Sequence, residues 1–253
     1  WLYLDKLDLA AQIYLNGEWI GEHSNYFHPC RIETTGLLRE GENCLAVQIE
    51  SGLIASANQS VEGLGETSRE VTKRLLLRKP QFQGGWDWAG RLMNVGLSGP
   101  VRLEYTHGEL RPDQFVPLVT VADDLRSARI DGRWHVEHLA GEATELEFRV
   151  GIPELGLEDS TLCRVEPGQQ CCEVSLHVPD PELWWPVGHG APRRYRLQAS
   201  LHLDGREVAS CERQVGFRRI EIDQSPHPVR GQHFTIRVNN RPVFCKGGNW
   251  VPA

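Results

Sequence analysis

Long hydrophobic runs and an excess of positive charge are both missing from this sequence, and each absence excludes a class of protein. No run approaches the roughly 18 apolar residues that a membrane-spanning helix requires. The net charge of −7 argues against a nucleic-acid partner, because such proteins need a basic face to neutralise phosphates. We therefore expect neither a membrane nor a nucleic acid as a partner.

Motifs for metal binding and redox chemistry are also missing. No C-x-x-C pair occurs among the seven cysteines, and the ten histidines show no H-E-x-x-H spacing. No metal site and no redox chemistry is therefore predicted. We interpret the cysteines as free, buried thiols of a reducing compartment, which favours the cytoplasm over the periplasm or secretion. They are Cys30, Cys44, Cys163, Cys171, Cys172, Cys211 and Cys245.

What is present is the composition of a globular protein with a β pattern. The 253 residues, 40% hydrophobic and 24% charged, suffice for one large domain or two ordinary ones. Short apolar runs surround Asn16-Gly17, Asp204-Gly205 and Asn239-Asn240. These residue types adopt the positive φ of tight hairpin turns. We therefore predict three β-hairpins.

Alternation of apolar and polar residues supports further strands. In residues 43–50, Leu45, Val47 and Ile49 fall on one face of a predicted strand, and residues 144–152 alternate in the same way. Residues 53–79 break the pattern, because they are polar, rich in small residues and weakly helical toward their end. Excursions of this length are uncommon in compact domains and are often functional.

Domain boundaries are expected near residues 105–112 and 218–226, where one strand closes and the next segment opens. The first residues, WLYLDKLDL, resemble a strand already in progress, so we expect the true N-terminus to precede Trp1 and the targeting of the protein to stay undefined. The chain then has three parts: 1–106, 107–222 and a short third piece, 223–253.

The segment GGWDWAGR, residues 84–91, carries the most conspicuous chemistry. Indole rings pack on the apolar faces of a pyranose, and a carboxylate accepts hydrogen bonds from two adjacent hydroxyls, with charge-assisted strength. Trp86 and Asp87 could therefore form a sugar subsite. In the alternative interpretation, Trp86 and Trp88 fill a sandwich core while Asp87 pairs with Arg91. In a plain strand both tryptophans would share one face, which fits either interpretation.

Five stretches in series resemble the β-mannosidase branch of glycoside hydrolase family 2. HPCRIETTGLLREGENCLAVQIES and RKPQFQGGWDWAGRLMNVGLSGPVRLE resemble the family's N-terminal jelly roll. DPELWWPVGHGAPRRYRL and QVGFRRIEI resemble its immunoglobulin-like domain, and FTIRVNNRPVFCKGGNWVPA resembles the first part of its catalytic (β/α)8 barrel. The chain departs from the family pattern at Gln83-Gly84-Gly85, at Ala89-Gly90 and at Ser98.

The resemblance implies an all-β fold. Residues 1–106 would be a sugar-binding, galactose-binding-like jelly-roll sandwich without its N-terminal part, and residues 107–222 an immunoglobulin-like sandwich. Residues 223–253 would begin the catalytic TIM barrel, with its first strand over Val243–Lys246.

The implied function is that of the accessory portion of a retaining exo-β-mannosidase, which would remove terminal β-D-mannose from oligosaccharides. The substrate is then the expected partner, no cofactor is needed, and the oligomeric state stays open. Both catalytic glutamates are expected beyond Ala253, so this stretch contributes no catalytic residue and should be inactive alone.

The resemblance also implies roles for individual residues. Asp87 would accept hydrogen bonds from the hydroxyls of the terminal mannose, Trp86 would form a wall of the subsite, and Trp88 would belong to the core. Asn249 and Trp250 would lie at the carboxyl end of the first barrel strand, where barrel enzymes place active-site groups. Alternatively, Asn249 caps a turn and Trp250 packs against the sandwich.

Two rival functions stay open. Another enzyme of the same family would act on β-galactosides, β-glucuronides or β-glucosaminides. A non-catalytic carbohydrate-binding or adhesion module would bind sugar without turnover. Trp184-Trp185-Pro186 does not separate these hypotheses, because we interpret the two rings as structural anchors of the second sandwich.

Overall fold

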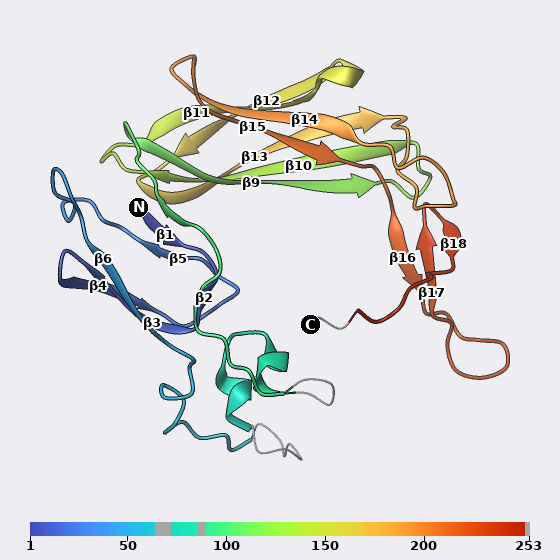
Figure 1. Cartoon of the computed structure of the whole chain (residues 1–253). Helices are drawn as coiled ribbons and strands as arrows, with labels where there is room; N and C mark the ends of the chain where they lie inside the picture. Colours follow the sequence, from blue (N-terminus) through green and yellow to red (C-terminus); the bar gives the residue numbers. More distant parts are fainter. Residues whose placement is uncertain (64–71, 86–89, 251–253) are drawn as a thin grey trace. The chain divides into compact units, whose positions relative to one another are not determined.

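The computed structural model describes residues 1–63, 72–85 and 90–250, and it confirms the predicted all-β class. The chain divides into two compact units, Trp1–Tyr105 and Thr106–Ala253. Figure 1 shows strands throughout both units, joined by turns and a few short 3-10 helices. No helix among the described residues is long and apolar enough to cross a membrane.

The first unit contains small antiparallel sheets of short strands. One sheet has the strand order β5-β1-β8, a second pairs β2 with β7, and a third has the order β4-β3-β6. Two 3-10 helices follow the third sheet. In chain order the elements are β1 (Leu2–Leu4), β2 (Leu7–Asp8), β3 (Ala10–Leu15), β4 (Glu18–His23), β5 (Cys30–Ile32), β6 (Leu45–Glu50), η1 (Thr72–Leu76), η2 (Gln81–Gly84), β7 (Gly96–Leu97) and β8 (Val101–Leu103).

The core of the first unit is built from the inward faces of these strands. Leu4, Leu7 and Ile13 are fully buried at its centre. Leu45, Val47 and Ile49 of β6 pack against this cluster, as their alternation predicts. The weak helical tendency predicted toward the end of residues 53–79 agrees with η1, a 3-10 helix over Thr72–Leu76.

The second unit is a two-layer antiparallel sandwich followed by a small sheet. One layer has the strand order β13-β10-β9 and the other β12-β11-β14-β15; Figure 1 shows them stacked. The register of β10 and β13 runs without interruption from Ser127–Pro179 to His138–Gly168. The elements are β9 (Leu110–Val121), β10 (Ser127–His138), β11 (Thr144–Ile152), η3 (Pro153–Leu155), β12 (Leu157–Val165), β13 (Gly168–Pro179), β14 (Tyr195–Leu203) and β15 (Arg206–Val215).

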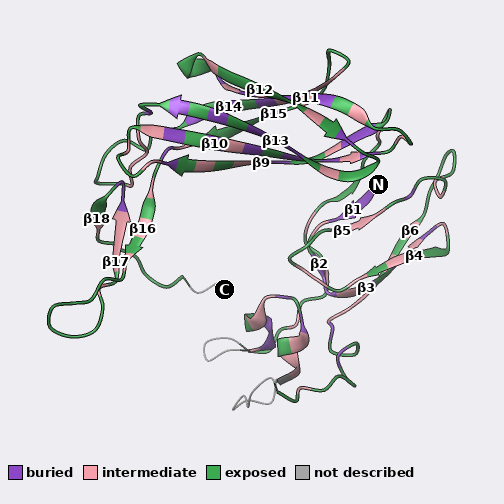
Figure 2. Cartoon of the chain, turned by 180° about the vertical axis from the view of Figure 1, so that it is seen from behind, coloured by how far each residue is buried: buried purple, intermediate pink, exposed green. Residues whose placement is uncertain are grey.

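An aromatic cluster lies between the two layers of the sandwich. Phe148 of β11 meets Phe115 edge-on, with ring centroids 6.0 Å apart, and Trp134 at 5.7 Å. Leu146, Phe148 and Val150 are all buried, which confirms the predicted alternation of residues 144–152. In Figure 2 buried residues recur along β10, β13 and β14, where the layers face each other.

A third sheet of the second unit follows the sandwich. It contains β16 (Ile220–Asp223), β17 (Thr235–Val238) and β18 (Arg241–Val243). Ile220–Asp223 therefore pair with β17 and not with the sandwich strands that precede them. Residues 244–250 have no regular secondary structure, so the strand expected over Val243–Lys246 is formed only at its first residue.

The three predicted hairpins are confirmed. Asn16 and Gly17 connect β3 to β4 with φ of 54° and 87°, and Asp204 and Gly205 connect β14 to β15 with 50° and 73°. The third turn, at residues 239–240, joins β17 to β18 in the same left-handed conformation.

The cysteines are free, as predicted, but the expectation that they are all buried is wrong. Cys30 and Cys172 are buried, whereas Cys44, Cys171 and Cys245 are exposed. Alternation explains the difference for the adjacent pair, because neighbouring residues of a strand point to opposite faces.

Candidate functional site

The predicted sugar subsite centres on Trp86 and Asp87, and these two residues lie outside the described residues, as does Trp88. The structure describes the chain on both sides of them, up to Gly85 and from Gly90 onward. These flanking residues show how the chain on either side of residues 86–89 is held by the first unit.

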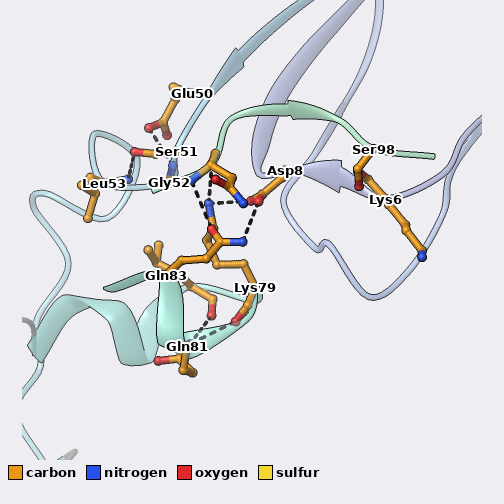
Figure 3. Close-up of polar contacts among 12 residues, drawn as sticks. Lys6, Asp8, Glu50, Ser51, Gly52, Leu53, Lys79, Gln81, Gln83 and Ser98 are labelled. Atoms are coloured by element: carbon orange, nitrogen blue, oxygen red, sulfur yellow. Dashed lines mark hydrogen bonds and ion pairs between the residues drawn. The ribbon is translucent and has the colours of Figure 1, made fainter. Parts of the chain in front are cut away.

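A buried ion pair lies next to the segment. Lys79 follows η1, and its Nζ lies 2.5 Å from Oδ1 of Asp8, the last residue of β2. The side chains are only 2% and 6% exposed. Such a pair is stable in the interior only when further hydrogen bonds satisfy its remaining polar atoms. Figure 3 shows Lys79, Asp8 and Gln83 pointing toward one another.

Gln83 and Asn94 supply those hydrogen bonds. Nε2 of Gln83 donates to Oδ2 of Asp8 at 3.2 Å, and Nζ of Lys79 donates to the carbonyl oxygen of Asn94 at 2.8 Å. The backbone N–H of Asn94 donates to Oε1 of Gln83 at 3.3 Å. Asp8, Lys79 and Gln83, here called the buried polar network, therefore bind the backbone of the exposed Asn94 and tie together the two residues that bracket 84–93.

Arginines add contacts at the start of the same segment. Nη1 of Arg74 donates to the carbonyl oxygen of Gly85 at 3.0 Å. Gly85 has φ of 96°, and a Cβ at this position would lie 2.8 Å from Cγ of Arg91. Only glycine allows both the backbone conformation and this close approach. Glycine is therefore required at position 85, directly before Trp86.

A single glutamine, Gln81 at the start of η2, connects η2 to η1 and to the loop that carries Lys79. Nε2 of Gln81 lies 3.0 Å from the carbonyl oxygens of both Arg74 and Leu77, and 3.3 Å from that of Lys79. Arg74 lies in η1, and Leu77 and Lys79 follow that helix, so Gln81 connects the end of η1 to the loop after it. Gln81 thereby positions the turn that carries Lys79.

The first unit also carries a groove of about 740 Å³, between the outward faces of β3, β4 and β6 and residues 52–59 and 76–78. Gln12, Glu22, Gln48 and Arg78 give it a polar lining. At one end Glu50 accepts hydrogen bonds from the N–H groups of residues 52, 54 and 55. Among the described lining residues, His23 provides the one aromatic ring, so this groove offers a poor platform for a pyranose face.

The other predicted site residues lie near the end of the second unit. Asn249 and Trp250 follow β18 in a stretch without regular secondary structure, and the side chain of Trp250 is 92% exposed. Trp86 and Asp87 belong to the sequence range of the first unit. Because Trp86 and Asp87 lie outside the described residues, a site shared by the two pairs stays a prediction.

The tryptophan pair of the second sandwich has a packing role. Trp184 lies under the guanidinium of Arg218 at 4.4 Å, and Trp185 under that of Arg241 at 4.7 Å. The carbonyl oxygen of Trp184 also accepts a hydrogen bond from Nδ2 of Asn239 at 2.9 Å. These contacts link the sandwich to the third sheet, which agrees with the predicted structural role.

Sequence reasoning missed the buried polar network. In the sequence, Asp8 and Lys79 resemble ordinary charged residues of a turn and a loop, and Gln83 stands out only as a departure from the family pattern. Each is less than 6% exposed. The one local signal in the sequence is the apolar Leu77 two residues before Lys79, which does not by itself predict burial of the lysine.

Comparison with known proteins assigns both units. A family model described as "Glycosyl hydrolase 2 galactose-binding domain-like" matches residues 1–99, and one described as "Glycosyl hydrolases family 2" matches residues 115–218. Both matches agree with the predicted galactose-binding-like and immunoglobulin-like sandwiches.

Individual relatives cover the whole chain. Beta-mannosidase B of Aspergillus clavatus is 32% identical over 100% of this chain and 30% of that protein, and its counterpart in Aspergillus terreus is 31% identical over the same shares. The chain therefore spans about 30% of the length of these curated relatives.

Solved structures also match nearly the whole chain. The beta-D-mannosidase of Dictyoglomus thermophilum has a TM-score of 0.85 and 29% identity, over 99% of this chain and 31% of that one. The exo-chitosanase of Amycolatopsis orientalis has a TM-score of 0.70 and 16% identity over 99% and 27%, a likeness of fold alone. Since models of one family match both sandwiches, in order and over most of the sequence, this chain belongs to glycoside hydrolase family 2.

Proposed function

We propose that this chain is the accessory portion of a β-mannosidase-like enzyme that removes terminal β-D-mannose from oligosaccharides with retention. The observation that carries the proposal is a difference in similarity between two solved structures of the same fold: the mannosidase exceeds the exo-chitosanase in both identity and TM-score. The beta-D-mannosidase of D. thermophilum is 29% identical with a TM-score of 0.85, whereas the exo-chitosanase is 16% identical with 0.70. Identity to the mannosidases extends over the whole chain.

In this proposal the chemistry belongs to the rest of the enzyme. Retaining glycosidases use two carboxylates about 5–5.5 Å apart, one as nucleophile and one as general acid and base. We place both glutamates beyond Ala253, in a (β/α)8 barrel that residues 223–253 begin. The carboxylate pair performs the proton transfers, so the reaction needs no cofactor.

Residues 1–106, the predicted jelly-roll domain, are proposed to contribute the sugar subsite. Asp87 accepts hydrogen bonds from hydroxyls of the terminal mannose, and Trp86 forms a wall of the subsite. The buried polar network supports this role because it binds Gln83 to Asn94, on either side of the segment. Rigid attachment of a binding segment reduces the ordering cost of holding a sugar.

Substrate profiling of the full-length protein tests the proposal. We expect kcat/KM for 4-nitrophenyl β-mannoside to exceed the values for the β-galactoside, β-glucuronide and β-glucosaminide by at least about 10-fold. The reason is that one misplaced hydroxyl leaves buried polar groups unpaired. NMR should show the β anomer as first product. A better rate with another glycoside, or binding without turnover, would instead support one of the two rival functions.

A further inference from the structure

The outward face of the sheet β4-β3-β6 carries an aromatic pair. Tyr14 of β3 and Trp19 of β4 are direct cross-strand partners, so their side chains lie on the same face of the sheet. The opposite face belongs to the core, where Ile13 and Leu15 of β3 are buried. Trp19 is 58% exposed, although tryptophan is on average a highly buried residue. Packing of the core therefore does not account for the position of this indole ring.

A bulge in β4 turns the tryptophan outward. The register between β3 and β4 shifts after Ile13, so that Gly21 is the partner of Ile13 whereas Trp19 is the partner of Tyr14. The extra residue is Ile20, which packs against the core of the first unit. Without the bulge, alternation would place Trp19 on the same, inward face as Gly21. The bulge therefore keeps the core contact of β4 and presents the indole to solvent.

A row of polar side chains lies next to the aromatic pair on the same face. Gln12, two residues before Tyr14, is the cross-strand partner of Glu22 on one side and of Gln48 on the other. All three polar residues are exposed, and all three line the groove of about 740 Å³. The hydroxyl of Tyr14 donates a hydrogen bond to Oε1 of Gln12 at 2.8 Å. The groove itself has no suitable ring, but this hydrogen bond connects it to the aromatic pair.

The two rows together have the chemistry that a chain of sugars requires. An exposed aromatic ring offers a flat apolar surface to the C–H face of a pyranose. Side-chain amides donate and accept hydrogen bonds, as sugar hydroxyls do, and a carboxylate accepts from two hydroxyls. Antiparallel strands rise about 3.4 Å per residue, so the two rows lie about 7 Å apart, a separation comparable with the length of one pyranose unit. One sugar can stack on the ring while the next contacts the polar row.

The charges of the groove favour a neutral sugar. Among the described residues of its lining, Arg78 is the only arginine or lysine, and two glutamates accompany it. Glu50 already accepts three backbone N–H groups of the following loop, which leaves Glu22 as the carboxylate beside the aromatic pair. An anionic or phosphorylated sugar would be repelled by this surface, because like charges close together cost free energy.

We propose that this surface, here called the Trp19 face and made of Gln12, Tyr14, Trp19, Glu22 and Gln48, binds a neutral, extended oligosaccharide of β-linked hexopyranoses. The indole of Trp19 carries one sugar, and the polar row holds the hydroxyls of the next. The face uses none of the residues of the proposed sugar subsite and does not rest on the proposed enzymatic function. Because its groups stay exposed and hydrated, we expect a Kd on the order of 1 mM for a hexasaccharide.

The test is native affinity electrophoresis of the full-length protein in gels with and without soluble glucomannan, a neutral β-1,4-linked polymer. A site for terminal sugars meets few chain ends in such a gel, so slower migration reports a surface that binds the interior of the chain. We expect glucomannan to slow the parent protein, and Trp19→Ala to abolish the effect. Trp19→Phe should keep part of it, because its ring still stacks. Gln48→Ala should raise the Kd by about 3- to 10-fold, through the loss of one hydrogen-bonding side chain.

Tyr105→Ala is the matched control, because Tyr105 is 71% exposed and lies outside this sheet. It should migrate as the parent does, and all variants should keep the Tm of the parent. Three results would overturn the proposal: no slowing of the parent by glucomannan, equal slowing of the parent and Trp19→Ala, or the same loss in Tyr105→Ala as in Trp19→Ala. Because migration does not depend on hydrolysis of a glycoside, the proposed enzymatic function can fail while this proposal stands, and the reverse.

Discussion

Nζ of Lys79 lies 2.5 Å from Oδ1 of Asp8, and both side chains are removed from water. The pair joins the loop after η1 to β2, two segments far apart in the sequence. A buried charge is tolerated only with its partner, so the two residues depend on each other. Because Gln83 and Asn94 bind the same pair, the base of the proposed sugar-binding segment depends on it too.

Replacing Lys79 by methionine should destabilise the first unit by about 3–5 kcal/mol, because the Asp8 carboxylate then stays buried without its counterion. Urea unfolding of the full-length protein measures this, as a lower midpoint for the transition of the first unit.

The exposed pair Arg164–Glu166 provides the control. Nε of Arg164 lies 2.9 Å from Oε1 of Glu166, but the side chains are 72% and 55% exposed. Arg164→Met should therefore cost less than about 1 kcal/mol. The double variant Asp8→Asn/Lys79→Met should recover part of the loss seen in the single variant. If Lys79→Met costs no more than Arg164→Met, the ion pair does not hold the unit together.

Asn239 should be the most sensitive residue of the third sheet. It is 2% exposed and has φ of 49°. Its Oδ1 accepts the N–H of Arg219 and its Nδ2 donates to the carbonyl oxygen of Trp184, both at 2.9 Å. Asn239→Ala loses both bonds and strains the turn, so we expect a loss of about 2–4 kcal/mol in chemical denaturation.

Glycine separates the two causes at this position. Asn239→Gly keeps the turn relaxed but still removes both hydrogen bonds, so its stability should lie between those of the parent and Asn239→Ala. Equal stability of the parent and the glycine variant would show that the side-chain amide contributes nothing.

Asp223 should make the third sheet sensitive to acid. The hydroxyl and the N–H of Ser225, followed by Arg237, hold the pKa of its carboxyl well below the ordinary value. Nη2 of Arg237 lies 3.0 Å from Oδ2 of Asp223. Because the pKa is lower in the folded state, the stabilisation is complete above the unfolded pKa of about 4 and is lost as the pH falls toward the folded value.

The Tm of the parent and of Asp223→Asn, followed from pH 7 down to pH 3, measures this contribution. The parent should be the more stable protein at pH 7, and the difference should narrow below about pH 5. A difference that stays constant over this range would mean that ionisation of Asp223 does not stabilise the sheet.

The parts of the fold that local residue chemistry determines could be predicted from the sequence. Asn16, Asp204 and Asn239 mark turns because asparagine and aspartate tolerate positive φ, and the structure has them at 54°, 50° and 49°. Alternation places Leu146 and Phe148 on one face of a strand, and both are fully buried. In both cases the deciding interactions lie within a few residues.

Long-range pairings could not be predicted. The contacts of Asp8 with Lys79 and of Asn239 with Trp184 join segments that are far apart in the sequence, and no local spacing predicts either contact. The role of Asp87 could not be predicted from the sequence pattern for a different reason. A carboxylate between two tryptophans suits both a core and a sugar subsite, so its assignment depends on resemblance to a family and stays a prediction.

The most direct test of the account is the effect of Asp87→Ala on kcat/KM of the full-length enzyme with a β-mannoside. If Asp87 accepts hydrogen bonds from two hydroxyls of the substrate, kcat/KM should fall on the order of 100-fold while the Tm stays unchanged. An unchanged kcat/KM would contradict the proposal that this segment binds the terminal sugar.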